Sequence, residues 1–225
     1  MEEKLSTNKK TARIAGILYL AVAVCSGFAL IVRSNLIVPG DASKTISNIT
    51  NSEILFRISL TSDLIGQIFF VLTVLILYKL LQRVNKNQAL VMIAFALIPV
   101  PIACISMVKQ FTMLQLLNKA DISTSLNQLH SQAMLFLESH DYGVLIAQVF
   151  WGLWLFPLSY LVIKSDYIPK SIGILLIFSG LGYVTDSFGK FLFPGYSISV
   201  SQFTFIGELV FIFWLLIKGV KTQKT

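Results

Sequence analysis

The sequence predicts an all-α fold, a polytopic membrane helix bundle with six transmembrane helices and both termini in the cytoplasm. Composition is the first observation: 55% of the 225 residues are hydrophobic and only 13% are charged, which a soluble domain could not cover with polar surface. The second is a series of long uncharged stretches, because about 20 helical residues cross a hydrocarbon core of ~30 Å. The third is a one-sided distribution of basic residues at the ends of these stretches.

The helices are expected to form a single transmembrane domain that spans residues 1–225. In chain order we predict them at residues 14–32, 54–78, 89–112, 139–163, 171–191 and 199–218. Three of the six reach a spanning length only if they continue through charged side chains. These charged residues are Arg57 and Asp63 in the second helix, Asp186 and Lys190 in the fifth, and Glu208 in the sixth. The sequence therefore predicts carboxylates inside the membrane.

The segments between the helices are short, with two exceptions. Residues 34–52 contain Pro39-Gly40-Asp41 and several asparagines, which predicts an external loop with a turn. Residues 125–138 show the pattern of an amphipathic helix on the outer face. Prolines at positions 99, 101 and 157 fall inside predicted helices, where each removes a backbone donor and favours a kink.

The basic residues set the predicted orientation. Twelve of the 18 Lys and Arg residues lie at one set of helix ends: Lys4, Lys9, Lys10, Arg13, Lys79, Arg83, Lys86, Lys164, Lys170, Lys218, Lys221 and Lys224. The positive-inside rule places these ends in the cytoplasm and the protein in the cell membrane as a multi-pass protein. Because the basic residues are spread over helix ends, we expect membrane lipids as partners and no nucleic acid.

The depth of the polar residues indicates where a site could form. With a rise of ~1.5 Å per residue from the cytoplasmic boundary, Asp63, Gln148 and Asp186 all lie about 24 Å up, and Glu208 lies about 15 Å up. Each of four helices then carries one polar stripe, and lipid accepts such stripes poorly. We therefore predict that they face one another or an outward-open polar pocket. The candidate binding residues are Arg57, Asp63, Gln67, His140, Asp141, Gln148, Asp186, Lys190 and Glu208.

A purely structural role for these residues is the competing interpretation. Asp186 and Lys190 have the spacing of a helical ion pair, and Arg57 could neutralise Asp63 or Glu208, so that a network would only hold helices together. No catalytic residue can be assigned. The sequence has two histidines, which excludes a three-histidine zinc site and leaves only a mixed carboxylate and histidine site open. It carries no nucleotide-loop, haem or CxxC motif. We therefore predict no metal and no cofactor.

Several motifs resemble bacterial membrane proteins grouped as domain-of-unknown-function family 4386. The opening motifs are RIAGILYL at 13–20 and VRSNLIVPGD at 32–41. The likeness continues at Phe56-Arg57, SDLIGQ at 62–67, His140, Tyr142-Gly143, FWGLWLFPL at 150–158, GLGY at 180–183, DSF at 186–188, Gly207-Glu208 and WLLIKG at 214–219. The resemblance implies a multi-pass membrane protein, and it supplies no substrate or reaction.

Three functions are compatible with this sequence. The first is an outward-facing, acid-lined pocket for a small solute, cation or proton, in transport or sensing. The second is an intramembrane enzyme that acts on a lipid or lipid-linked substrate, with Asp63, Asp186 or Glu208 as acid or base. The third is a structural or regulatory membrane subunit. The shape of the cavity and the satisfaction of its polar groups would distinguish them.

Overall fold

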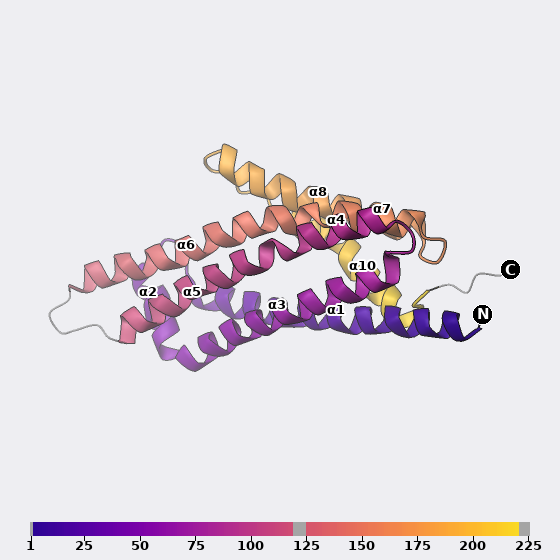
Figure 1. Cartoon of the computed structure of the whole chain (residues 1–225). Helices are drawn as coiled ribbons and strands as arrows, with labels where there is room; N and C mark the ends of the chain where they lie inside the picture. The colour runs from indigo at the N-terminus through magenta and orange to yellow at the C-terminus, as the bar shows by residue number, and fades with distance from the viewer. Residues whose placement is uncertain (1, 119–124, 221–225) are drawn as a thin grey trace. The chain divides into compact units, whose positions relative to one another are not determined.

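The chain folds entirely into helices over residues 2–118 and 125–220, which are the residues described by the computed structural model (Figure 1). The helices are α1 (Glu2–Leu36), α2 (Ala42–Asn51), α3 (Glu53–Leu81), α4 (Lys86–Leu97), α5 (Pro99–Asn118), α6 (Leu126–Leu153), α7 (Leu155–Lys164), α8 (Lys170–Leu192), α9 (Ser201–Thr204) and α10 (Ile206–Ile217). The predicted all-α class is confirmed. Lys221 and Lys224, used above for orientation, lie outside the described residues.

Five helical stretches are long and apolar enough to cross a membrane. They are Lys9–Leu36, Glu53–Leu81, Lys86–Asn118, Leu126–Lys164 and Lys170–Leu192. They correspond to the first five predicted helices and indicate a multi-pass membrane protein. A shorter apolar stretch, Ser201–Ile217, lies where the sixth helix is expected.

Prolines account for two interruptions in these stretches. A proline at position i leaves the carbonyl of residue i−4 without its helical donor. Pro101 has this effect on Leu97, where α4 ends, and Pro157 has it on Leu153, where α6 ends. The kinks predicted from the prolines therefore appear as short breaks at Ile98 and at Trp154.

The predicted loop over residues 34–52 is wrong in part, because most of it forms the helix α2. Asp41 begins this helix by accepting a hydrogen bond from the Lys44 amide at 2.9 Å. Ile46 and Ile49 lie on its buried face. The turn at Pro39-Gly40 does form, with Gly40 at a positive φ of 80°. A helix with one apolar face and a side-chain cap is stable here because it covers apolar side chains of its neighbours.

A second correction concerns residues 125–138. The predicted separate amphipathic helix is the first half of α6, which continues without a break into the predicted fourth transmembrane helix. Leu129, Ala133 and Leu137 are buried at helical spacing, whereas Gln128 and Gln132, each directly before a buried residue, are exposed. Amphipathic periodicity and the following apolar run thus belong to one helix.

The helices form two compact units, which we describe separately. Unit 1 comprises residues 1–21, 69–100 and 145–225, and unit 2 comprises residues 22–68 and 101–144. In unit 1, α8 packs against α7, α9 and α10, and α4 packs against α7. Glycines permit the close approach within unit 1: a Cβ on Gly152 would lie 2.9 Å from the Gly180 carbonyl oxygen. The prediction of a single domain stays a prediction.

Unit 2 contains α2, α5 and parts of α1, α3 and α6. Its apolar cluster consists of Val32, Leu36, Ile46, Ile49, Phe56, Met113, Leu114, Ala133 and Leu137. Every helix of unit 2 contributes to this cluster, and α2 contributes both of its isoleucines. The cluster serves as a reference for the polar side chains of unit 2, which lie next to it along the same helices.

Candidate functional site

A layer of buried polar side chains lies next to the apolar cluster of unit 2. On α5, Gln110 is one helical turn from Met113, and on α6, His140 is one turn from Leu137. On α1, Arg33 directly follows Val32 in the sequence. On α3, Asp63 and Gln67 continue the buried face that begins with Phe56 and Ser59. We call Arg33, Asp63, Gln67, Ser106, Gln110 and His140 the polar layer.

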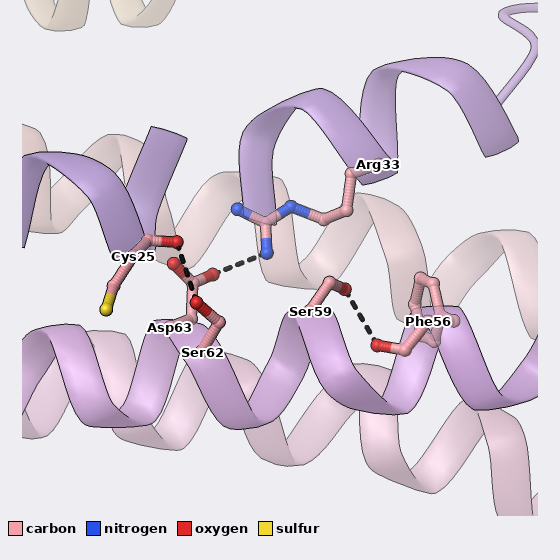
Figure 2. A network of polar contacts seen from close by, with 6 residues as sticks. All are labelled: Cys25, Arg33, Phe56, Ser59, Ser62 and Asp63. Carbon is pink, nitrogen blue, oxygen red and sulfur yellow. Dashed lines mark hydrogen bonds and ion pairs between the residues drawn. The ribbon is translucent and has the colours of Figure 1, made fainter. Parts of the chain in front are cut away.

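An ion pair joins α1 to α3 in this layer. The guanidinium of Arg33 donates a hydrogen bond to the Asp63 carboxylate, and Figure 2 shows the two side chains pointing toward each other. Both are largely removed from solvent, with side-chain exposures of 16% and 10%. Beside them Ser62 donates to the Cys25 carbonyl oxygen at 3.0 Å, which fixes the two helices at close distance (Figure 2). The charges of the pair cancel within the layer.

Four polar atoms of the layer have no hydrogen-bond partner among the described residues. They are Gln67 Oε1, both side-chain polar atoms of Gln110, and His140 Nδ1. The three residues are at least nine-tenths buried, with exposures of 8%, 0% and 3%. A buried polar atom without a partner costs about 1–3 kcal/mol. Folded proteins satisfy most such atoms, so this concentration makes the polar layer the candidate binding site of unit 2.

His140 on α6 lies against α5 within the layer. Its ring lies beside the backbone of Ser106. Helices α5 and α6 are in contact here, since a Cβ on Gly143 would meet the Ser106 hydroxyl at 1.9 Å. Gln110 is one helical turn from Ser106 on the same buried face of α5. These contacts bring His140 on α6 next to Ser106 and Gln110 on α5.

Arg57 does not join this layer, although the sequence allowed it to pair with Asp63 or Glu208. It donates instead to Glu53 on its own helix at 2.7 Å. Asn118 donates to the same carboxylate at 3.0 Å, and the Arg57 guanidinium lies 5.7 Å from the centre of the Phe111 ring. The residue that neutralises Asp63 is Arg33, near the end of α1.

Unit 1 holds a half-buried carboxylate, Glu208 at the start of α10. It accepts hydrogen bonds from Tyr19 on α1 and from Tyr183 on α8, the latter at 2.8 Å. Tyr19 is held in place by edge-to-face contacts with Trp154 and Phe211. Both partners are uncharged hydroxyls, and Glu208 forms no salt bridge within the described part of the chain. Such a carboxyl group can accept a proton or bind a small cation without first breaking an ion pair.

Asp186, also in unit 1, is fully satisfied by local donors. Its carboxylate accepts from the amides of Val200 and Ser201, each at 2.8 Å, and from the Tyr196 hydroxyl at 3.2 Å. The two amides open the short helix α9, where backbone N–H groups lack helical acceptors. Asp186 therefore joins the end of α8 to the start of α9, and the expected pair with Lys190 does not form.

The remaining candidates are peripheral. Gln148 donates to the Tyr183 carbonyl oxygen at 3.3 Å, which links α6 to α8 in unit 1. Asp141 and Lys190 are exposed. Of the nine predicted residues, the structure brings Asp63, Gln67 and His140 into one layer. The convergence of Asp63 with Asp186 and Gln148 involves both units and stays a prediction.

Sequence reasoning missed three members of the polar layer: Arg33, Ser106 and Gln110. For two of them a signal existed. Ser106 and Gln110 are four residues apart in an otherwise apolar stretch, which is the spacing of a helical face. Arg33 follows an apolar run, and this pattern is equally typical of an arginine that extends to the membrane surface.

The all-helical fold with five apolar stretches of spanning length indicates a protein of the multi-pass membrane class. The chain belongs to the family described as "Domain of unknown function (DUF4386)", which matches residues 14–219. A protein of Archaeoglobus fulgidus described as an uncharacterized protein is 32% identical over 148 residues, which are 66% of this chain and 75% of that protein. No solved structure matches the chain.

Proposed function

We propose that the protein binds a small polar solute in the polar layer of unit 2, in transport or sensing at the cell membrane. The unpartnered atoms of Gln67, Gln110 and His140 carry this proposal. A network that only held helices together would pair its own donors and acceptors, because each buried unpaired group destabilises the fold. A solute that supplies the missing partners recovers this free energy on binding.

The chemistry of the layer narrows the class of solute. Arg33 and Asp63 neutralise each other, so a bare ion gains little from the layer. The unpartnered atoms include the donor amide of Gln110 and the acceptor oxygens of both glutamines. A neutral or zwitterionic molecule with both donors and acceptors, such as an amide or an amino acid, fits this set.

The solute is expected to stabilise the protein that binds it. We expect glycine or acetamide to raise the melting temperature of the purified protein in detergent, and sodium chloride at equal concentration to leave it unchanged. Gln110→Leu should weaken the response at least about tenfold, since two hydrogen-bonding groups are lost. Gln132→Leu, the same change at an exposed site of α6, should respond like the unaltered protein.

Two results would contradict the proposal. One is an unaltered dose response in Gln110→Leu. The other is a combined result: the unaltered protein does not respond to any solute, and Gln110→Leu has a higher melting temperature. This would mean that an apolar side chain fits the layer better than glutamine and that the layer only packs helices together.

The proposal includes six membrane crossings with both termini in the cytoplasm. Support comes from the twelve basic residues at one set of helix ends and from the apolar stretch Ser201–Ile217. Single cysteines test it in a background without Cys25 and Cys104. An impermeant maleimide should label Ser43→Cys on intact cells and Lys86→Cys only after permeabilisation; both positions are exposed. The reverse pattern would overturn the orientation.

A further inference from the structure

A groove in unit 1, whose lining includes neither Asp186 nor Glu208, has the chemistry of a lipid headgroup site. It has a volume of about 520 Å³ and lies between the end of α3 with its following turn and the end of α7 with its following turn. Leu80 and Val84 line it on the α3 side, and Tyr160 and Tyr167 line it on the α7 side. Two apolar spanning helices thus end at one groove.

The groove has a fixed wall. The Tyr167 hydroxyl donates to the Leu80 carbonyl oxygen at 3.0 Å, which joins the two turns. Burial raises the pKa of Tyr167 to about 12, so this donor stays protonated at neutral pH. Ser165 donates to the Val162 carbonyl oxygen at 2.7 Å and closes the last turn of α7. The groove therefore keeps its shape without a ligand.

The charges around the groove favour an anion. Arg83 and Lys164 line it and are exposed, and Asp166 is the single carboxylate among its lining residues. Arg83 and Asp166 line the groove together with Tyr167, the residue that forms its wall. Basic pockets at the cytoplasmic ends of transmembrane helices bind phosphate groups of anionic lipids.

The surroundings favour a lipid over a soluble anion. Tyr160 is 40% exposed on α7 and lines the groove, and an exposed tyrosine at the end of an apolar helix is typical of the membrane interface. Leu72 and Leu75 on α3 are exposed before that helix reaches the groove. Acyl chains can lie on such a surface while a phosphate occupies the groove.

We propose that the groove binds the phosphate of an anionic phospholipid, with Arg83 and Lys164 as its cationic ligands and Tyr160 at headgroup level. This inference is independent of solute binding in unit 2. It assigns a specific lipid to one place, whereas the sequence predicted only that basic helix ends would lie near lipid.

Lipid retention tests the proposal on the full chain. The protein is reconstituted in phosphatidylcholine nanodiscs doped with phosphatidylglycerol, released into mild detergent, and weighed by native mass spectrometry. We expect phosphatidylglycerol to remain bound to the unaltered protein. Arg83→Gln with Lys164→Gln should reduce retention about tenfold, because each cation contributes separately to lipid affinity. Lys86→Gln with Lys170→Gln removes the same charge from exposed residues outside the groove lining and should retain the lipid.

Three outcomes would overturn the inference. If both double variants lose phosphatidylglycerol equally, the loss reflects net charge and not the groove. If the unaltered protein shows no preference for phosphatidylglycerol, there is no specific lipid site. Displacement of the lipid by inorganic phosphate at comparable concentration would identify a soluble anion site instead. If the groove variant fails to fold, Lys164→Gln alone must show part of the loss, and unchanged retention in that variant contradicts the proposal.

Discussion

Arg33→Met should destabilise the protein by about 3–5 kcal/mol, which corresponds to a fall of roughly 10 °C in melting temperature. The substitution keeps most of the side-chain volume and leaves the Asp63 carboxylate in a largely buried place without its cation. A buried charge that loses its partner retains its desolvation cost and loses the attraction that offset it. Thermal unfolding in detergent, followed by circular dichroism, measures the effect.

Arg57→Met is the matched control, because it removes the same group from an exposed pair. The side chains of Arg57 and Glu53 are 37% and 28% exposed and lie one helical turn apart. Pairs of this kind contribute about 0–1 kcal/mol. Combining Arg33→Met with Asp63→Leu should restore most of the lost stability, since neither charge is then left alone. Similar losses for Arg33→Met and Arg57→Met would mean that water reaches the Arg33 pair freely.

Gly207→Ala should separate α10 from α8 and cost about 1–3 kcal/mol or more. A Cβ at this position would lie 2.5 Å from the Leu175 carbonyl oxygen and 2.7 Å from its carbonyl carbon. Backbone atoms of a packed helix do not move aside as the tip of a flexible side chain does, so α10 itself must shift. The shift would also move Glu208, the next residue, away from the Tyr183 hydroxyl on α8.

Gly27→Ala is the control for this prediction. Gly27 lies within α1, and a Cβ there would have nothing within 4 Å. Alanine is a better helix former than glycine by about 1 kcal/mol, so this variant should match or exceed the stability of the unaltered protein. Thermal unfolding measures the stability of both variants against that of the unaltered protein. Equal stability of Gly207→Ala and Gly27→Ala would show that α10 and α8 are not in close contact.

The long helices were predictable from the sequence. A helix that crosses lipid must be apolar over its whole spanning length, and this length can be counted from the run of apolar residues. The breaks were predictable because a proline affects one known carbonyl. The helix α2 was missed, since turn residues in the same segment gave the stronger signal. This helix is stable because it packs on apolar side chains of other helices. Such tertiary contacts cannot be predicted from the sequence of the segment itself.

The polar layer was predicted in part for a related reason. Asp63 and Gln67 are recognisable because a carboxylate inside an apolar helix is costly wherever it points. Arg33 and Arg57 are harder to separate, since an arginine near a helix end can turn toward water or toward the bundle. Only the packing of α1 on α3, where Ser62 reaches the Cys25 carbonyl, decides that Arg33 turns inward.

Helix α2 places a hydrocarbon seal over one end of unit 2. Asn48 donates to the Leu36 carbonyl oxygen at 3.1 Å, and Thr45 bonds to the Val38 amide and carbonyl, so α2 is fastened to the end of α1. Beneath it Ile46 and Ile49 complete the apolar cluster, which separates this end from the polar layer. A hydrated ion would have to shed its water to pass such a seal. Among the residues that the structure describes, the route from the polar layer toward α2 is therefore lined by the apolar side chains of this cluster.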